Sequence, residues 1–473
     1  LTITGVIDDG VNTFGLEKTG YYGLTLAGAN TYGGDTLIRG GRLLLDNATG
    51  AALYNGTTGT VRINNDNTTG SYSPGGNFVG VQTLRDNQLG ANVNLSFEGT
   101  TYASGYFNEF SLNGTSQTIG NLLDQGGGYR NLIQQQNTAN NLNGTLTVTQ
   151  TSDATYTGSF RRSYNGSGSE LNLVKNGSAT LTFKTSSSHP NHLQGGNLTV
   201  NAGELVYNID DDPCSNGNCT LGLNKVTVNA GATFTYINDT SVTLLPEIAG
   251  AGTIQLKGIN ASGVGDFDLT RTNASFSGAI RISDSARLKL GTAAGLGTAT
   301  LDVASGSGVY VYTTTPITNT LRLAGNGWAE STGRLGALRM DNGSNWAGNI
   351  ELTANADVGV YNSSSVSSTI SGVVSGAFQL SKTWGGTLTL SGNNTYSGGL
   401  ALYGGLLKVA SVGNAGAASA LGASSAAASN LLFSGGSLAY TGASAATTDR
   451  GFSIAPGATA LIDLPSGNLA FSG

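Results

Sequence analysis

The sequence predicts an all-β fold: a right-handed parallel β-helix (β-solenoid) that forms a single elongated rod. Three observations carry this prediction. One unit recurs along the chain, short runs of alternating apolar and polar residues follow one another at roughly ten-residue spacing, and Gly, Asn, Ser and Thr fill the segments between those runs. Units that cannot bury an apolar face alone must stack on one another, which is how a solenoid forms its core.

The clearest unit covers residues 382–409, and residues 18–45 repeat it without a gap. A constant shift of 364 positions takes Lys18 to Lys382 and carries the whole unit with it. A looser copy covers residues 175–206. We therefore interpret the three segments as equivalent coils of one repetitive fold.

Each unit contains three short strands separated by sharp corners. Alternating leucines predict half-buried strands, and the Gly-rich segments between them tolerate the positive φ angles that a tight corner needs. The leucines that we expect to point inward are Leu24, Leu26, Leu388 and Leu390.

An aromatic residue precedes the Gly corner in the two clear units and in two weaker echoes of them: Tyr32, Phe276, Trp346 and Tyr396. We predict that these residues form corner stacks inside the fold. A sugar-binding platform is the alternative. We disfavour it because the four residues lie in different parts of a long rod rather than on adjacent turns.

Composition favours one unit over residues 1–473. No Pro-rich linker divides the chain, and charged residues make up only 11% of it, so neutral polar residues must solubilise the surface. The alternating 38% apolar content argues against disorder. A string of β-sandwiches, the competing all-β fold, would show charged outer faces and modules of about 100 residues.

Charge and hydropathy argue against a nucleic-acid partner and against a membrane-spanning helix. The formal net charge is −6, and no basic stripe is present to neutralise phosphates, so we expect no nucleic-acid partner. No uninterrupted apolar run approaches the roughly 18 residues of a membrane-spanning helix.

Two segments carry a resemblance to a known family: KTWGGTLTLSGNNTYSGG from Lys382 and KTGYYGLTLAGANTYGGD from Lys18. Both resemble the passenger-associated repeat of Gram-negative autotransporters. The resemblance implies a secreted β-helical passenger that is exported through the periplasm and the outer membrane to the cell surface by a C-terminal β-barrel. We expect that barrel, and a signal peptide, to lie outside this sequence. Because the family contains adhesins, self-associating proteins and hydrolases, the resemblance indicates location better than activity.

Cys214 and Cys219 are the only cysteines, and Asn216-Gly217 between them is a turn dipeptide. We predict a disulfide that closes a loop near residues 208–222, because an exported chain passes through an oxidising periplasm. Two free thiols are the alternative. A zinc site would need two further soft ligands.

Two polar clusters are candidate binding residues. The first contains His189 and His192, in the lengthened corner of the central unit, and the second is the run Asp210, Asp211 and Asp212. We predict solvated loop histidines and a solvated acidic turn. The alternatives are metal ligands or a catalytic triad for the histidines, and a calcium site or the acid cluster of a polysaccharide-cleaving β-helix for the aspartates. We expect no metal and no cofactor.

The sequence contains no catalytic motif that we recognise, and we expect no enzyme activity. The favoured function is that of a surface adhesin or self-association rod whose partners are copies of itself, or glycans or proteins of a host or other surface. One alternative is the stalk of a secreted hydrolase or polysaccharide lyase, or such an enzyme itself. A structural filament subunit is the other.

Overall fold

Contacts in the computed structural model divide the chain into two compact units. Unit 1 contains Leu1–Tyr236 and Leu245–Gly252, and unit 2 contains Ile237–Leu244 and Thr253–Gly473. Each unit is described by itself, and the single rod over residues 1–473 stays a prediction. The structure describes residues 1–54, 57–65, 78–90, 92–98, 107–126, 130–135, 142–161, 169–184, 193–194, 196–209, 222–238, 241–244, 246–259, 265–330, 333–361, 363, 365–465 and 467–473.

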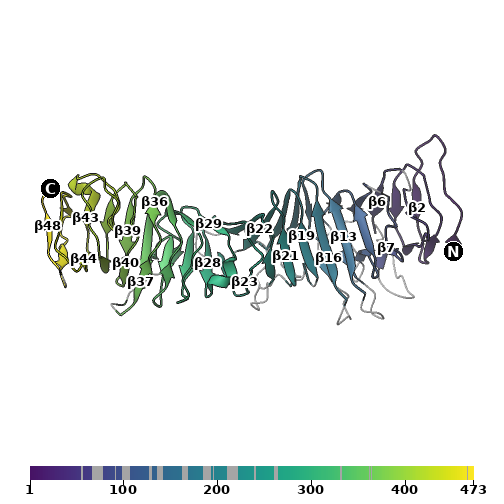
Figure 1. Cartoon of the computed structure of the whole chain (residues 1–473). Coiled ribbons are helices and arrows are strands. Elements are labelled where there is room, and N and C mark those ends of the chain that lie inside the picture. Colours follow the sequence, from purple (N-terminus) through teal and green to yellow (C-terminus); the bar gives the residue numbers. More distant parts are fainter. Residues whose placement is uncertain are drawn as a thin grey trace. The chain divides into compact units, whose positions relative to one another are not determined.

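Three ladders of parallel strands, and the start of a fourth, form unit 1 (Figure 1). The first contains β1 (Thr2–Ile3), β3 (Leu24–Leu26), β5 (Arg42–Leu45), β7 (Phe78–Thr83), β9 (Phe107–Ser111), β12 (Asn131–Gln134), β15 (Ser159–Arg161) and β18 (Leu193–Gln194). The second contains β2 (Leu16–Lys18), β4 (Thr36–Ile38), β6 (Thr60–Ile63), β8 (Asn94–Phe97) and β11 (Leu122–Asp124). The third contains β10 (Ser116–Ile119), β13 (Gly144–Thr149), β16 (Leu171–Asn176), β19 (Asn197–Val200), β21 (Lys225–Val228) and β24 (Glu247–Ala249). The fourth contains β14 (Ala154–Tyr156), β17 (Thr180–Lys184) and β20 (Glu204–Asn208), followed in the chain by β22 (Thr233–Asn238).

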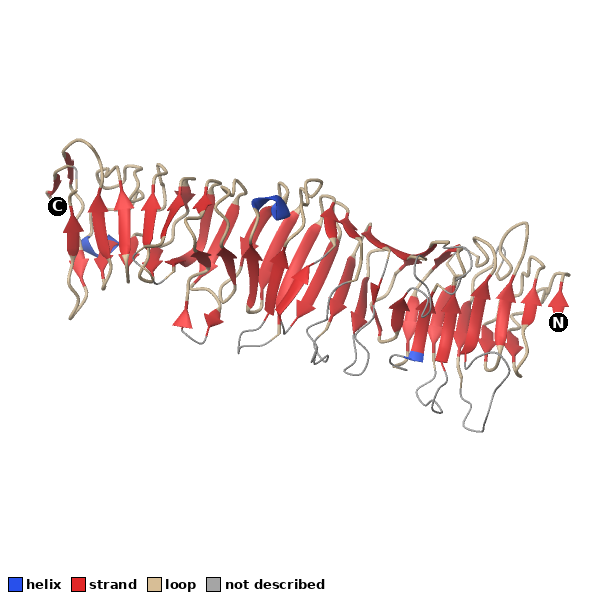
Figure 2. Cartoon of the chain, turned by 90° about the horizontal axis from the view of Figure 1, so that it is seen from below, coloured by secondary structure: helices blue, strands red, loops and turns tan. Residues whose placement is uncertain are grey.

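Unit 2 repeats this arrangement (Figure 2). Its long ladder contains β23 (Ser241–Leu244), β25 (Thr253–Gly258), β26 (Gly265–Leu269), β27 (Ala279–Ser283), β28 (Ala286–Leu290), β29 (Thr300–Val303), β30 (Gly308–Val311), β31 (Leu321–Gly325), β34 (Leu338–Met340), β36 (Ile350–Val360), β38 (Val374–Ser375), β39 (Leu380–Thr383), β41 (Leu400–Leu402), β43 (Leu431–Phe433) and β46 (Ser453–Ile454). A second ladder contains β35 (Asn345–Trp346), β37 (Ser367–Ile370), β40 (Thr387–Leu390), β42 (Leu406–Val409), β44 (Ser437–Tyr440) and β47 (Leu461–Asp463).

Few elements depart from these parallel ladders. β45 (Ala446–Thr448) pairs with β48 (Leu469–Phe471) in parallel, and β32 (Ala329–Glu330) pairs with β33 (Gly333–Arg334) as an antiparallel hairpin. Two short 3-10 helices, η2 (Ala293–Leu296) and η3 (Ala428–Asn430), lie between strands. The predicted all-β parallel fold is confirmed.

Alternation of side chains produces the core. β13 buries every second residue, as does β16, with which it pairs in register. Of the leucines expected to point inward, Leu26, Leu388 and Leu390 are fully buried. Leu24 is only half-buried, because β1, its neighbour on one side, begins opposite the following residue, Thr25.

Candidate functional site

A buried lysine closes the first corner of each repeat. Lys18 Nζ donates hydrogen bonds to the carbonyl oxygens of the next two residues, at 2.7 and 2.9 Å, and to that of Gly40 in the next turn of the coil, at 2.8 Å. Lys382 makes the same three bonds at 2.8, 2.6 and 3.0 Å, the last to Gly404. Lys175 donates to the second following residue and to the next turn, at 2.9 and 3.0 Å. The lysine therefore ties each corner to the turn stacked upon it.

Burial lowers the pKa of all three lysines: to about 7 for Lys382, to about 8 for Lys175, and in the same direction for Lys18. Three carbonyl acceptors match the three N–H groups of an ammonium and act against that shift. Every acceptor is a backbone carbonyl of the coil itself. The arrangement therefore serves the corner, and leaves the ammonium groups no access to a substrate.

A buried asparagine joins three successive turns at the second corner. Asn30 Oδ1 accepts a hydrogen bond from Ile7 N at 2.7 Å, and its Nδ2 donates to Ala52 O at 2.6 Å. Asn394, at the matching position of the other clear repeat, makes the same pair of bonds at 2.8 and 3.0 Å. An amide can accept and donate at once, which explains why the corner needs Asn and not Asp.

The repeat-corner aromatics are core residues. Tyr32 is 1% exposed, and Phe276, Trp346 and Tyr396 are fully buried. The Nε1 of Trp346 donates to Asn319 O at 3.1 Å, so its polar edge is satisfied inside the fold. None of the four presents a ring to solvent, as a sugar-binding platform would require.

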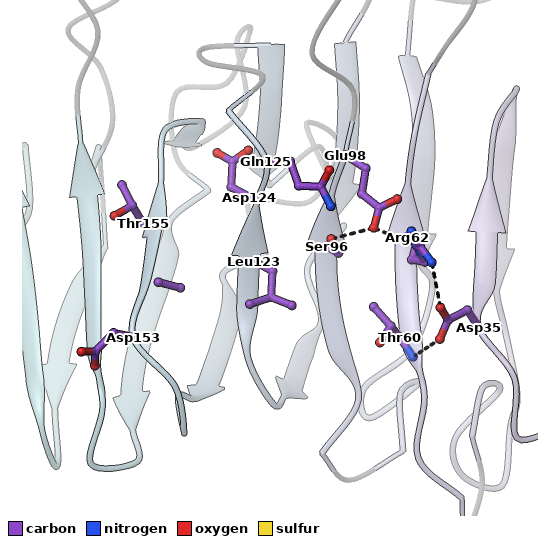
Figure 3. A pocket seen from close by; sticks show the side chains of 11 residues that line it. Asp35, Thr60, Arg62, Ser96, Glu98, Leu123, Asp124, Gln125, Asp153 and Thr155 are labelled. Atoms are coloured by element: carbon purple, nitrogen blue, oxygen red, sulfur yellow. Dashed lines mark hydrogen bonds and ion pairs between the residues drawn. The ribbon is translucent and has the colours of Figure 1, made fainter.

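An open pocket of about 500 Å³ lies on the outer face of unit 1, across β4, β6, β8, β11 and β14 (Figure 3). The register of the parallel strands sets the floor of this pocket. Three of its lining residues, Arg62, Ser96 and Leu123, are register neighbours on successive parallel strands. A smaller pocket of about 340 Å³ continues it across β17 and shares Asp153, Ala154 and Thr155. Together they form a polar groove, with four carboxylates and one arginine in its lining.

Arg62 lies between two of the groove carboxylates (Figure 3). Its Nε is 2.7 Å from Glu98 Oε1, and its Nη1 is 3.1 Å from Asp35 Oδ2. Ser96 Oγ donates to the same Glu98 oxygen at 3.1 Å, and the hydrogen bond to Glu98 raises the pKa of Arg62. This chain of charges fixes both carboxylates in the groove wall.

Asp124, further along the groove, accepts four hydrogen bonds. Its Oδ1 accepts from Gly126 N at 3.0 Å and from Asn131 Nδ2 at 2.7 Å. Its Oδ2 accepts from both the backbone N–H and the hydroxyl of Thr157, each at 2.7 Å. A carboxylate so engaged organises the corner after β11 and has little capacity left for proton transfer.

A second polar cluster lies on the outer face of unit 2, over β26, β28 and β30. Arg287 forms a bidentate pair with Asp266, at 2.7 and 2.8 Å, and lies between the rings of Trp328 and Tyr310, 4.4 and 5.8 Å from their centroids. Arg339 lies over the same Tyr310 ring at 4.2 Å. Asp266, Arg287, Tyr310 and Arg339 belong to different strands that the register brings together, and Trp328 lies in the loop between β31 and β32.

The other predicted site residues lie beyond the part of the chain that the structure describes. These are the disulfide pair Cys214 and Cys219, the histidines His189 and His192, and the aspartates Asp210, Asp211 and Asp212. Each stays a prediction. The sequence interpretation missed the groove residues, whose only signal was a polar residue at outward positions of neighbouring strands.

No three His, Cys, Asp or Glu side chains gather as metal ligands would among the described residues. No helix in the same part of the chain has the length and apolarity needed to cross a membrane.

Comparisons with known proteins agree with the repeat geometry. The passenger-associated-transport-repeat family matches residues 16–45, 173–206 and 380–409, the three segments that contain the lysine corners. The chain is 28% identical over 345 residues to the adhesin BmaC autotransporter of Brucella suis biovar 1. That alignment covers 63% of this chain and 10% of the relative, so the chain spans about a tenth of that protein. No solved structure matches. Together the repeats and this relative support an autotransporter passenger domain, and they indicate a secreted, surface-exposed protein of a Gram-negative bacterium.

Proposed function

We propose that the chain is an adhesin-type passenger segment that acts by binding, including binding to copies of itself, and not by catalysis. The observation that supports this most is the in-register outer face of unit 1. There the same outward position recurs on successive strands, as at Leu37, Arg62, Ser96 and Leu123. A face that presents an outward side chain at every turn offers many weak contacts, and these add through avidity.

Electrostatics support contacts between copies. The chain has few charges for its length, so two copies repel one another weakly when they lie side by side. On the described outer face of unit 1, Arg62 is paired with Asp35 and Glu98 inside the same chain. Adhesion by the Brucella relative, as its name states, supports the same class of function.

A settling assay on bacteria that display the full passenger tests the proposal. Displaying cells should clump or adhere more than matched cells without display. Purified passenger should show no hydrolase or lyase turnover on polysaccharide or ester substrates. If display leaves both settling and adhesion unchanged, the binding function is wrong.

The polar groove makes a secreted hydrolase or lyase the second candidate, because it gathers Asp35, Glu98, Asp124 and Asp153 in one pocket. Turnover that Glu98→Gln or Asp124→Asn abolishes would establish that alternative, provided that both variants keep the circular dichroism spectrum of the parent. The His189→Ala, His192→Ala and Asp211→Asn variants test the sequence-predicted candidates in the same assays.

A further inference from the structure

Three aromatic residues follow the ends of three successive strands in unit 2. Tyr361 comes directly after β36, Trp384 after β39 and Tyr403 after β41. The strands are parallel and in register, with Val358 opposite Lys382 and Lys382 opposite Leu402. Tyr361, Trp384 and Tyr403 stand three, two and one residues beyond Val358, Lys382 and Leu402, so they lie in one corner on adjacent turns, each one position out of step with the next.

These rings face outward, unlike the corner aromatics of the repeat. Tyr361 is 51% exposed and Tyr403 is 47% exposed. Trp384 is half-buried, and its Nε1 donates to Arg334 O at 3.1 Å, which fixes the orientation of the indole. The corner thus carries one anchored ring between two open ones.

The backbone at Trp384 is unusual. It adopts a φ of 66°, in the left-handed region that bulky residues avoid. The matching positions of the other two repeats, two residues after the lysine, are Gly20 with φ 71° and Gly177 with φ 78°. Since Lys382 Nζ bonds the carbonyl oxygen of Trp384, the lysine corner requires this conformation whichever residue is present. A tryptophan where glycine fits without strain points to a use for its side chain.

The nearest neighbours of the three rings are mostly small, and Gly385, Gly404 and Gly405 flank them in the sequence. The charged residues on neighbouring β34, Arg339 and Asp341, are paired with each other at 3.0 Å. Arg334, whose carbonyl oxygen anchors Trp384, is exposed, and its Nη1 donates to Gly327 O. Flat rings with few aliphatic neighbours suit a ligand that has flat apolar faces and polar edges.

We propose that Tyr361, Trp384 and Tyr403 form a stacking platform for the pyranose rings of a polysaccharide. The C–H groups on one face of a pyranose pack against an aromatic ring, while its hydroxyls bond at the rim. Strands about 4.8 Å apart and the one-residue stagger place the three residues on a diagonal across the corner, so an extended sugar chain would follow that diagonal. This proposal rests on the binding function above and names its ligand class.

Binding to defined oligosaccharides tests the platform. The probes are hexamers of β-1,4-linked glucose, β-1,4-linked N-acetylglucosamine and α-1,6-linked mannose, titrated into the purified 473-residue chain by calorimetry. Intrinsic fluorescence gives a second readout. Of the three tryptophans, Trp346 is fully buried and Trp328 is stacked on Arg287, so a ligand-induced change should come from Trp384.

Two variants remove the platform. Trp384→Gly places glycine where the other repeats have it and keeps the carbonyl that Lys382 binds, so the corner should stay folded. Tyr403→Ala removes a half-exposed ring. Each should weaken binding of the bound hexamer at least tenfold. Phe378→Ala is the matched control, because Phe378 is 39% exposed but lies before β39, at the opposite end of the strand, and it should bind as the parent does.

Three results would overturn the platform: binding of no hexamer, unchanged binding by Trp384→Gly, or equal loss in all three variants. Selective binding of a quaternary ammonium ligand or of a protein would assign the corner to a different partner and also reject it. The settling assay separates this outcome from the broader function. Suppose that the chain binds no sugar, but cells that display the Trp384→Gly passenger clump as cells with the parent passenger do. The binding function would then stand, and only the platform would be rejected.

Discussion

Tyr396 occupies the position of Tyr32 in the matching repeat, yet its buried hydroxyl lacks the hydrogen bond that Tyr32 makes. The Tyr32 hydroxyl is 2.6 Å from Thr36 Oγ1. The residue that corresponds to Thr36 is Leu400, which offers no polar atom, and the Tyr396 hydroxyl has no hydrogen-bond partner among the described residues. Burial raises the pKa of Tyr32 to about 12 and that of Tyr396 further in the same direction.

Removal of the two hydroxyls should therefore have opposite effects. Tyr396→Phe removes a desolvated group without a partner and should leave the unfolding free energy unchanged or raise it by up to about 1 kcal/mol. Tyr32→Phe breaks a buried bond and should lower it by about 1 kcal/mol. Thermal unfolding of the two variants beside the parent measures both. A larger loss from Tyr396→Phe would contradict the structure.

Substitution of Asn394, which joins three turns, should lower the unfolding free energy far more than substitution of its neighbour Asn393. Asn394→Ala leaves Val374 N and Ala420 O without their side-chain partner in the core and should cost about 2–4 kcal/mol, since each unsatisfied buried group costs about 1–3 kcal/mol. Asn393→Ala changes an exposed residue and should stay within about 0.5 kcal/mol. Chemical denaturation monitored by circular dichroism compares them, and equal costs would refute the bridging role.

Loss of a lysine corner should destabilise the turns that it joins. Lys382→Met preserves side-chain length but leaves three carbonyl oxygens without their shared donor, so we expect a loss of about 2 kcal/mol or more. Lys408→Met removes the same charge from an outward position of β42 and is the matched control. Limited proteolysis should cut the Lys382→Met chain near the corner, and the Lys408→Met chain no faster than the parent.

Stability should rise with pH in the alkaline range. The pKa of Lys382 falls from 10.5 to about 7 on burial, so between these values the unfolded chain holds a proton that the folded chain lacks. The unfolding free energy therefore increases as pH rises from 7 towards 9.5, and the contribution is lost as pH falls to 7. Lys175 acts in the same direction. Melting temperatures at pH 7 and 9.5 should show a smaller rise in Lys382→Met than in the parent, and an equal rise would contradict the assignment.

The two classes of surface ion pair in unit 2 should differ in energy. Arg287 is 13% exposed, bidentate with Asp266 and packed between two rings, so Arg287→Ala should cost about 2–4 kcal/mol. Arg322 and Glu351 form an exposed pair at 3.2 Å, and Arg322→Ala should cost less than about 1 kcal/mol. Thermal unfolding of the two variants measures this difference. A larger loss of stability from Arg322→Ala than from Arg287→Ala would show that the stacking contributes little.

The sequence was sufficient for the strands and for the repeats. Alternating leucines identified β3 and β40, and the predicted units begin two residues inside the matched family segments. It was also sufficient to place Tyr32 and Tyr396 at equivalent corners. A regular period and a recurring Lys, Asn and Gly carry this information locally.

The groove could not be predicted, because turn lengths vary. Thr36 pairs with Val61 and Val61 with Leu95, so successive turns span 25 and then 34 residues. No constant period aligns Asp35 with Glu98. The outward ring of Trp384 escaped prediction for a different reason: strand alternation gives the side-chain direction only within a strand, and Trp384 lies in a left-handed corner.

The bond pattern of Asn30 has a mechanical consequence. Its amide grips a donor in the preceding turn and an acceptor in the following turn, so a pull that peels one turn away must break that side-chain link as well as the ladder. Under an applied force, unfolding should therefore proceed easily through turns without such a residue and stop where one is present. The repeats would then act as points along the coil that resist unfolding under force.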